Sequence, residues 1–137
     1  MTHNLITAPP TLALPDALKL MAKHNIRRLP VVDKGKLVGI VTRGDLRGAQ
    51  ASEATSLSKF ELNYLVERIT LDRFMTRNPV TVADTATIVE AARTMLQRKI
   101  SGLPVIQGGR LVGIITESDI FRLVVRTWEH QPQPSVA

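Results

Sequence analysis

Short apolar runs rich in β-branched residues alternate along this chain with segments whose apolar residues recur at three- and four-residue spacing. The runs are typical of strands, and the spaced segments are typical of amphipathic helices. Tight turns at 33–35 and 107–109 join two pairs of strands into hairpins. The predicted strands are 5–7, 29–32, 36–41, 79–82, 103–106 and 110–115.

Helices are predicted where the apolar spacing becomes helical. One begins near Pro15, which suits the first helical turn, and one begins at Thr87 with capping-box spacing to Glu90. The core-facing residues are predicted to be Leu14, Leu18, Met21 and Ala22 in the first, and Ile88, Ala91, Ala92, Met95 and Leu96 in the second. A short helix is predicted after Thr42, and a final helix from about Thr116 to Trp128.

The middle and the end of the chain have a different composition. Residues 47–58 are rich in small and polar residues and are predicted to form a loop. An amphipathic connecting helix is predicted from Ser58 to Ile69. The tail at 129–137 contains two prolines and few apolar residues, so we expect it to fray.

The chain contains one of its segments twice. Residues 26–45 and 100–119 align without a gap at an offset of 74, with 11 of 20 positions identical. Both copies contain a Leu-Pro-Val strand and end in a glycine, two apolar residues and Thr-x-x-Asp. Two copies are too few for a solenoid. They predict a pseudo-two-fold pair of units with a cleft between the halves.

The predicted fold class is α/β, of the α+β kind, with two tandem β-α-β-β-α motifs and a connecting helix. The predicted boundaries are 1–48 for the first motif, 49–70 for the linker and connecting helix, 71–128 for the second motif and 129–137 for the tail. The 137 residues suffice for two half-sized units.

Composition narrows the function classes. No cysteine is present, which excludes disulfides and thiolate chemistry. No run is apolar enough to span a bilayer, and no secretory leader is recognised, so a cytoplasmic protein is expected. The net charge of +6 favours anionic partners, but the basic residues are scattered and only five aromatic residues are present. We therefore do not expect nucleic-acid binding.

No catalytic or metal site is predicted. The three histidines lie at a terminus, at a helix end and in the tail, and phosphate-loop and nucleophile-elbow motifs are missing. The repeated Thr42/Asp45 and Thr116/Asp119 pairs have two interpretations. They can cap the following helix, which spacing alone favours. They can also bind a phosphate and ribose hydroxyls at a helix N-terminus.

The two copies differ just before the Leu-Pro-Val strand. The first copy has Arg27 and Arg28 there, whereas the second has Ser101 and Gly102. Paired arginines could bind phosphates, or they could be two exposed charges. In either case the halves of any cleft are inequivalent.

These doubled motifs, together with Asn-Pro-Val-Thr-Val at 78–82, resemble a tandem pair of CBS (cystathionine β-synthase) motifs over residues 1–126. The chain also resembles stand-alone bacterial CBS-pair proteins similar to acetoin-utilisation regulators. The resemblance implies a non-catalytic regulatory or energy-sensing module that binds AMP, ADP, ATP or S-adenosylmethionine between its motifs. It also implies a homodimer, which would act on a separate effector protein.

The resemblance assigns ligand contacts by position. In one cleft they are Asp119, Thr116 and Ile114 with Asn4 and Ile6, and in the other Asp45, Thr42 and Ile40 with Asn78, Pro79 and Val80. Ile26, Arg27, Ile100 and Ser101 border both clefts, and Arg27 and Arg28 are the phosphate candidates. The Asp45 cleft is expected to be better formed, because the other one relies on the chain terminus. A ligand-free dimerisation or protein-interaction module is the alternative function.

Overall fold

The computed structural model describes residues 5–53 and 68–136, which form two compact units. The first unit comprises Ile6–Pro79, and the second comprises Leu5 with residues 80–136. Each unit has a three-stranded sheet and its own hydrophobic core. The mixed α/β fold class predicted from the sequence is confirmed.

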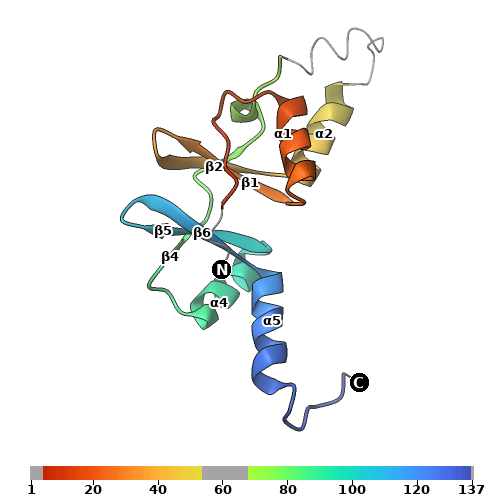
Figure 1. Ribbon diagram of the computed structural model, residues 1–137, viewed down its shortest axis with the longest axis vertical. Helices are drawn as coiled ribbons and strands as arrows, with labels where there is room; N and C mark the ends of the chain where they lie inside the picture. The colour runs from red at the N-terminus through yellow and green to blue at the C-terminus, as the bar shows by residue number, and fades with distance from the viewer. Residues whose placement is uncertain (1–4, 54–67, 137) are drawn as a thin grey trace. The chain divides into compact units, whose positions relative to one another are not determined.

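The first unit is built around a sheet with the strand order β1-β2-β3, in which neighbouring strands are antiparallel (Figure 1). Its elements are α1 (Leu14–Lys23), β1 (Arg28–Asp33), β2 (Lys36–Thr42), α2 (Arg43–Glu53), the 3-10 helix η1 (Leu71–Arg73) and β3 (Thr76–Arg77). The extended segment expected at 5–7 forms no strand. Ala8 instead makes an isolated parallel bridge to Val31.

Residues after the connecting segment complete the core of this first unit. Leu71 is fully buried beside Leu14, and Met75 packs in the same cluster. Backbone hydrogen bonds tie this stretch to residues near the N-terminus: Leu14 N to Ile69 O, Leu71 N to Leu12 O and Asp72 N to Pro10 O. The start of the predicted second motif therefore packs in the first unit.

Two sequence predictions for the first unit need correction. Helix α2 continues to Glu53, so residues 47–53 are helical where a loop was expected. Burial of Leu46 and Ala49 explains the difference, because these contacts outweigh the low helix propensity of Gly48. In α1, Ala17 is buried and Ala22 is exposed, so the core-facing side is slightly rotated from the prediction. Residues 54–67, which include most of the expected connecting helix, lie outside the described residues.

The second unit repeats the hairpin of the first, with a different outer strand. Its elements are β4 (Val82–Ala83), α4 (Ile88–Arg98), β5 (Gly102–Gln107), β6 (Arg110–Thr116) and α5 (Glu117–Trp128). Strand β4 pairs parallel with β5, which pairs antiparallel with β6. The register shift between Val105 and Ile106 matches that between Val31 and Val32, and the two hairpins have identical burial patterns.

The core of the second unit is smaller than the sequence predicted. It comprises Ala91, Met95, Leu103, Val105 and Ile115. Ile88 is 43% exposed and Leu96 is 81% exposed, so the predicted five-residue face of α4 is wrong at these positions. A helix that crosses a small sheet buries only the residues over that sheet. The capping box of Thr87 and Glu90 is confirmed.

No helix among the described residues is long and apolar enough to cross a membrane.

Candidate ligand-binding site

Each Thr-x-x-Asp motif forms the junction between a strand and a helix. At the end of β2, Thr42 N donates to Asp45 Oδ2 at 3.1 Å, and Asp45 N donates to Thr42 Oγ1 at 3.0 Å. At the end of β6, Thr116 N donates to Asp119 Oδ2 at 2.8 Å, and Asp119 N donates to Thr116 Oγ1 at 3.4 Å. Both motifs are therefore helix caps, as their spacing predicted.

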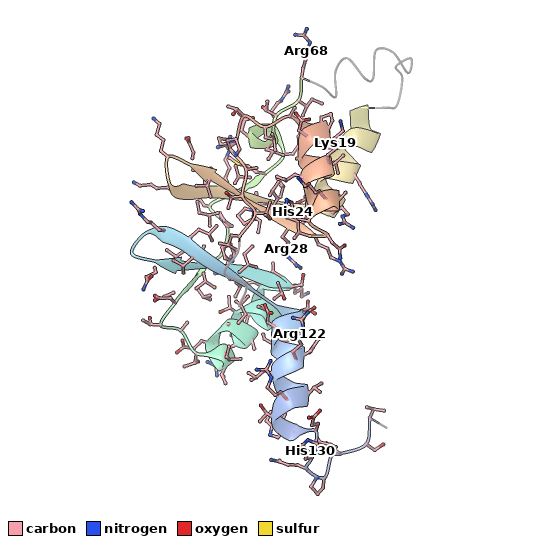
Figure 2. All side chains as sticks on the ribbon, viewed as in Figure 1. Lys19, His24, Arg28, Arg68, Arg122 and His130 are labelled. Atoms are coloured by element: carbon pink, nitrogen blue, oxygen red, sulfur yellow. The ribbon has the colours of Figure 1, made fainter. Side chains whose placement is uncertain are left out.

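In the first junction the cap uses one carboxylate oxygen of Asp45. The hydrogen bonds of Asp45 to described residues involve Oδ2, so Oδ1 can accept from a ligand hydroxyl. In the second junction, Asp119 Oδ1 accepts from Arg122 Nη1 at 3.2 Å. Arg122, on the first half of α5 (Figure 2), is 67% exposed, so a ligand can compete for this contact. A ligand hydroxyl would therefore have to displace Arg122 from Asp119 Oδ1, whereas no described residue makes such a contact with Asp45 Oδ1.

Backbone hydrogen bonds hold each junction next to the residue pair that precedes the hairpin. Arg43 N donates to Arg27 O at 2.9 Å, and the corresponding Glu117 N donates to Ser101 O at 3.0 Å. In the first unit the Arg43 side chain also donates to Ile26 O at 3.0 Å. The fold therefore brings Thr42 and Asp45 close to the 26–27 pair, and Thr116 and Asp119 close to the 100–101 pair.

The charges at the two junctions are opposite. Arg27, Arg28 and Arg43 gather at the first junction, where Figure 2 labels Arg28. The corresponding residues of the second unit are Ser101, Gly102 and Glu117. The difference at the first two positions was predicted from the sequence, whereas the change from Arg43 to Glu117 was missed. This change was visible in the sequence, because Arg43 and Glu117 each directly follow the repeated threonine.

The contacts predicted together with Asp45 and Thr42 belong partly to the first unit and partly to the second. Ile40 of β2 is opposite Thr76 of β3, and Asn78 and Pro79 follow directly in the same unit. Asn78 has a φ of 50°, in the left-handed region that asparagine tolerates better than most residues. Val80 belongs to the second unit and packs against its core.

The other predicted contacts have mainly structural surroundings. Ile6 and Ile26 pack against the core of the first unit, and Ile100 against that of the second. Ile114 is half-buried opposite Pro104. Asn4 lies outside the described residues.

A groove of about 510 Å³ lies within the second unit, between α4 and α5. Ile100 and Ser101, which were predicted as contacts, line it. Its other lining residues, which the sequence did not single out, are Ala92, Met95, Leu96, Lys99, Glu117, Ile120 and Phe121. The wall is mainly apolar, with Lys99 and Glu117 as its charged groups. In the described parts of the chain, no three His, Asp or Glu side chains are close enough to hold a metal ion.

Comparison with known proteins decides the family. The model of the CBS domain matches residues 1–52 and 67–126. The chain belongs to the CBS domain family. A CBS domain-containing protein of Dictyostelium discoideum is 36% identical over 137 residues, covering 98% of this chain and 94% of that protein. L-aspartate semialdehyde sulfurtransferase of Methanocaldococcus jannaschii is 38% identical over 120 residues, but this CBS pair spans only 21% of its length.

Solved CBS pairs share the fold. The CBS domain pair of protein MJ0100, in complex with 5′-methylthioadenosine and S-adenosyl-L-methionine, is 35% identical with a TM-score of 0.78 and 93% coverage of both chains. A putative acetoin utilization protein from Vibrio cholerae is 36% identical with the same TM-score, covering 98% of this chain and 94% of its own. CBSX2 in complex with AMP is 31% identical with a TM-score of 0.74 and 90% coverage of both chains.

Proposed function

We propose that this CBS pair is a cytoplasmic regulatory module that binds an adenosyl ligand, either AMP, ADP or ATP or S-adenosylmethionine, through its Thr-Asp junctions. Its role is non-catalytic: ligand binding biases the conformation of the pair, and a separate effector protein responds. Such a bias requires that the ligand bind two conformations unequally. We further propose that the working form is a homodimer.

The proposal mainly rests on Asp45 Oδ1, which accepts no hydrogen bond from the residues that the structure describes. The cap orients the carboxylate through Oδ2 and leaves the other oxygen available to ribose hydroxyl donors. Capping and ligand binding are therefore compatible in one residue. Related CBS pairs in complex with AMP and with S-adenosylmethionine support the adenosyl class.

The charges at the first junction favour a ligand with phosphate groups. Arg27 and Arg43 are joined there by the backbone hydrogen bond from Arg43 N to Arg27 O, and Arg28 follows directly. Guanidinium groups form charge-assisted hydrogen bonds with phosphate oxygens. We therefore rank AMP, ADP and ATP above S-adenosylmethionine for contacts made by this junction. The other predicted contact residues remain part of the proposal.

The alternative is a ligand-free interaction module, and one observation favours it. Both oxygens of Asp119 accept hydrogen bonds within the protein, Oδ2 from Thr116 and Oδ1 from Arg122, as expected of a carboxylate with a structural role. If Asp45 has the same role, neither junction binds a ligand and the chain acts through protein contacts alone.

A calorimetric titration of the whole protein with AMP, ADP, ATP and S-adenosylmethionine tests the proposal. Asp45→Asn keeps a carbonyl oxygen for the cap but removes the charge, and we expect it to weaken binding about 10- to 100-fold, as for losing a hydrogen bond to a charged group. Asp119→Asn, titrated in parallel, tests the second junction.

Glu90→Gln is the matched control, because Glu90 forms the same kind of cap with Thr87 but is not a predicted contact. It should leave binding unchanged. If folded wild-type protein gives no heat with any ligand, the adenosyl proposal is wrong. If Asp45→Asn and Asp119→Asn both bind like the wild type, the ligand binds elsewhere.

A further inference from the structure

The two Thr-Asp junctions differ in charge as well as in hydrogen bonding. Six positions at or beside each junction align at the offset of 74. In the first unit they are Asn25, Arg27, Arg28, Arg43, Asp45 and Gly48, and in the second they are Lys99, Ser101, Gly102, Glu117, Asp119 and Arg122. The first set contains three basic residues and one acidic residue, whereas the second contains two of each. Of these two sets, the first alone has an excess of positive charge.

Backbone contacts keep these charges beside the Thr-Asp pairs. The hydrogen bond from Arg43 N to Arg27 O holds two of the arginines together at the end of β2. The corresponding bond from Glu117 N to Ser101 O holds a carboxylate next to a neutral residue at the end of β6. The position after the repeated threonine therefore changes sign between the junctions while its backbone contact stays the same.

The basic residues of the second junction do not give it a positive excess. Arg122 donates to Asp119 Oδ1 at 3.2 Å, so its charge is paired with that carboxylate. Lys99 and Glu117 both line the groove beside the junction, so a phosphate group there would meet one charge of each sign. A phosphate consequently gains no net attraction at this junction.

At the first junction the arginines can bind a phosphate without losing their structural contacts. Arg43 Nη2 donates to Ile26 O at 3.0 Å, and the other N–H groups of a guanidinium can still donate to phosphate oxygens. The hydrogen bond of Arg27 to Arg43 uses the backbone oxygen of Arg27, so it leaves the Arg27 guanidinium out of the contact. The first junction is thus suited to an anionic ligand.

We propose that the residue after the repeated threonine determines the ligand class of each junction. The first junction, with Arg43, takes adenosyl ligands that carry phosphate groups, and the second, with Glu117, takes adenosyl ligands without phosphate. Adenosine and S-adenosylmethionine belong to the second class, and the sulfonium and ammonium groups of S-adenosylmethionine are attracted by the Glu117 carboxylate. This inference rests on the proposed adenosyl binding and adds to it a different ligand for each junction.

Calorimetric titration of the full chain with AMP and with adenosine, which differ only by the phosphate, tests this division. Asp119→Asn weakens the second junction and so reports on the first, whereas Asp45→Asn reports on the second. In the Asp119→Asn protein we expect AMP to bind at least about 10-fold more tightly than adenosine. In the Asp45→Asn protein we expect adenosine and S-adenosylmethionine to bind at least as tightly as AMP.

Glu117→Arg gives the second junction the sign of the first. Glu117 is exposed, and in the described part of the chain its side chain makes no ion pair. Its contact with Ser101 uses the backbone N–H, which any substitution except proline retains. Combined with Asp45→Asn, Glu117→Arg should raise the ratio of AMP affinity to adenosine affinity about 10-fold. Glu117→Gln, which removes the charge without reversing it, should raise this ratio about 3-fold.

Glu129→Arg is the matched control, because it makes the same change of charge in the same unit. Glu129 follows the 12-residue helix that begins at Glu117, so it lies about 18 Å further along the helix axis. This separation exceeds the Debye length of about 8 Å at physiological ionic strength. Glu129→Arg should therefore leave the ratio unchanged. Added salt should reduce the AMP preference of the Asp119→Asn protein, because that preference is electrostatic.

The outcomes separate this inference from the proposed function. If both Asn variants prefer AMP to the same degree, or if Glu117→Arg changes the ratio no more than Glu129→Arg does, the division by charge is wrong while adenosyl binding stands. An Asp45→Asn protein that binds none of the three ligands, although the wild type binds AMP, would also overturn the division. If the folded wild type binds none of them, adenosyl binding is wrong and the division falls with it. Circular dichroism establishes that each variant is folded.

Discussion

Gly39, in the middle of β2, is a position where a single added methyl group should disturb the packing. A Cβ at this position would lie 2.5 Å from Met75 Sδ, 2.8 Å from Met75 Cγ and 3.0 Å from the backbone oxygen of Thr76. Gly39 is buried and pairs with Arg77, so β3 lies directly alongside. The glycine is needed for close packing at this point.

The size of the effect follows from what can move. The Met75 side chain is flexible but only 9% exposed within the core, so a new rotamer would displace other core residues. The Thr76 oxygen belongs to the backbone and moves only with β3. Overpacking of this kind typically costs about 1–3 kcal/mol, and we expect Gly39→Ala to lower the free energy of unfolding by an amount in this range.

Urea unfolding followed by circular dichroism measures the change, with Met75→Ala and the double variant completing a cycle. Met75→Ala removes both side-chain atoms that clash, so the double variant should be more stable than the sum of the single effects predicts. Strict additivity, or a Gly39→Ala protein as stable as the wild type, would refute the packing argument. Displacement of β3 should also weaken adenosyl binding through the adjacent Asn78 and Pro79 if the proposed contacts are correct.

Three other substitutions have distinct expected outcomes. Gly48→Ala in α2 introduces a Cβ with nothing within 4 Å and should raise the free energy of unfolding by about 0.5–1 kcal/mol, measured by urea unfolding. Lys34→Asn should raise the thermal midpoint modestly, because Lys34 has a φ of 52° before Gly35 in a two-residue hairpin turn where Asn-Gly is preferred; a lower midpoint would contradict the turn assignment. Arg122→Ala should change the free energy of unfolding by less than about 0.5 kcal/mol, since the pair with Asp119 is an exposed i, i+3 contact. The same variant should strengthen adenosyl binding at Asp119 severalfold by calorimetry, and weaker binding would mean that Arg122 itself contacts the ligand.

The sequence predicted those parts of the fold that depend on local chemistry. The two hairpins follow from apolar runs joined by turn residues, and the caps of α4 and α5 follow from side-chain spacing. The two hairpins also share one register, since Arg28 pairs with Thr42 just as Gly102 pairs with Thr116. These features need only a few neighbouring residues, so their signal is present in the chain itself.

Features set by tertiary contacts were harder to predict. The continuation of α2 to Glu53 depends on burial of Leu46 and Ala49, which no local pattern reveals in a segment rich in small residues. The exposure of Leu96 depends on how little sheet α4 covers. At the candidate site, the Thr-Asp junctions were predicted, but the contact of Arg43 with Ile26 depends on the folded path of the chain.

Leu71 and Met75 belong to the predicted second motif but pack in the first unit. The boundary between the predicted motifs therefore does not coincide with the boundary between the folded units, which lies after Pro79. A fragment that stops at residue 48 would contain the whole first motif, yet it would lack the core side chains of Ile69, Leu71 and Met75 and the strand β3, which pairs with β2. A fragment extended to Pro79 would contain every described contact of that core. Separating the two halves by proteolysis or by gene truncation should therefore succeed just after Pro79 and fail at the end of the first repeat. The first motif therefore needs residues from the start of the second motif to complete its core and its sheet, so the two motifs are not independent folding units.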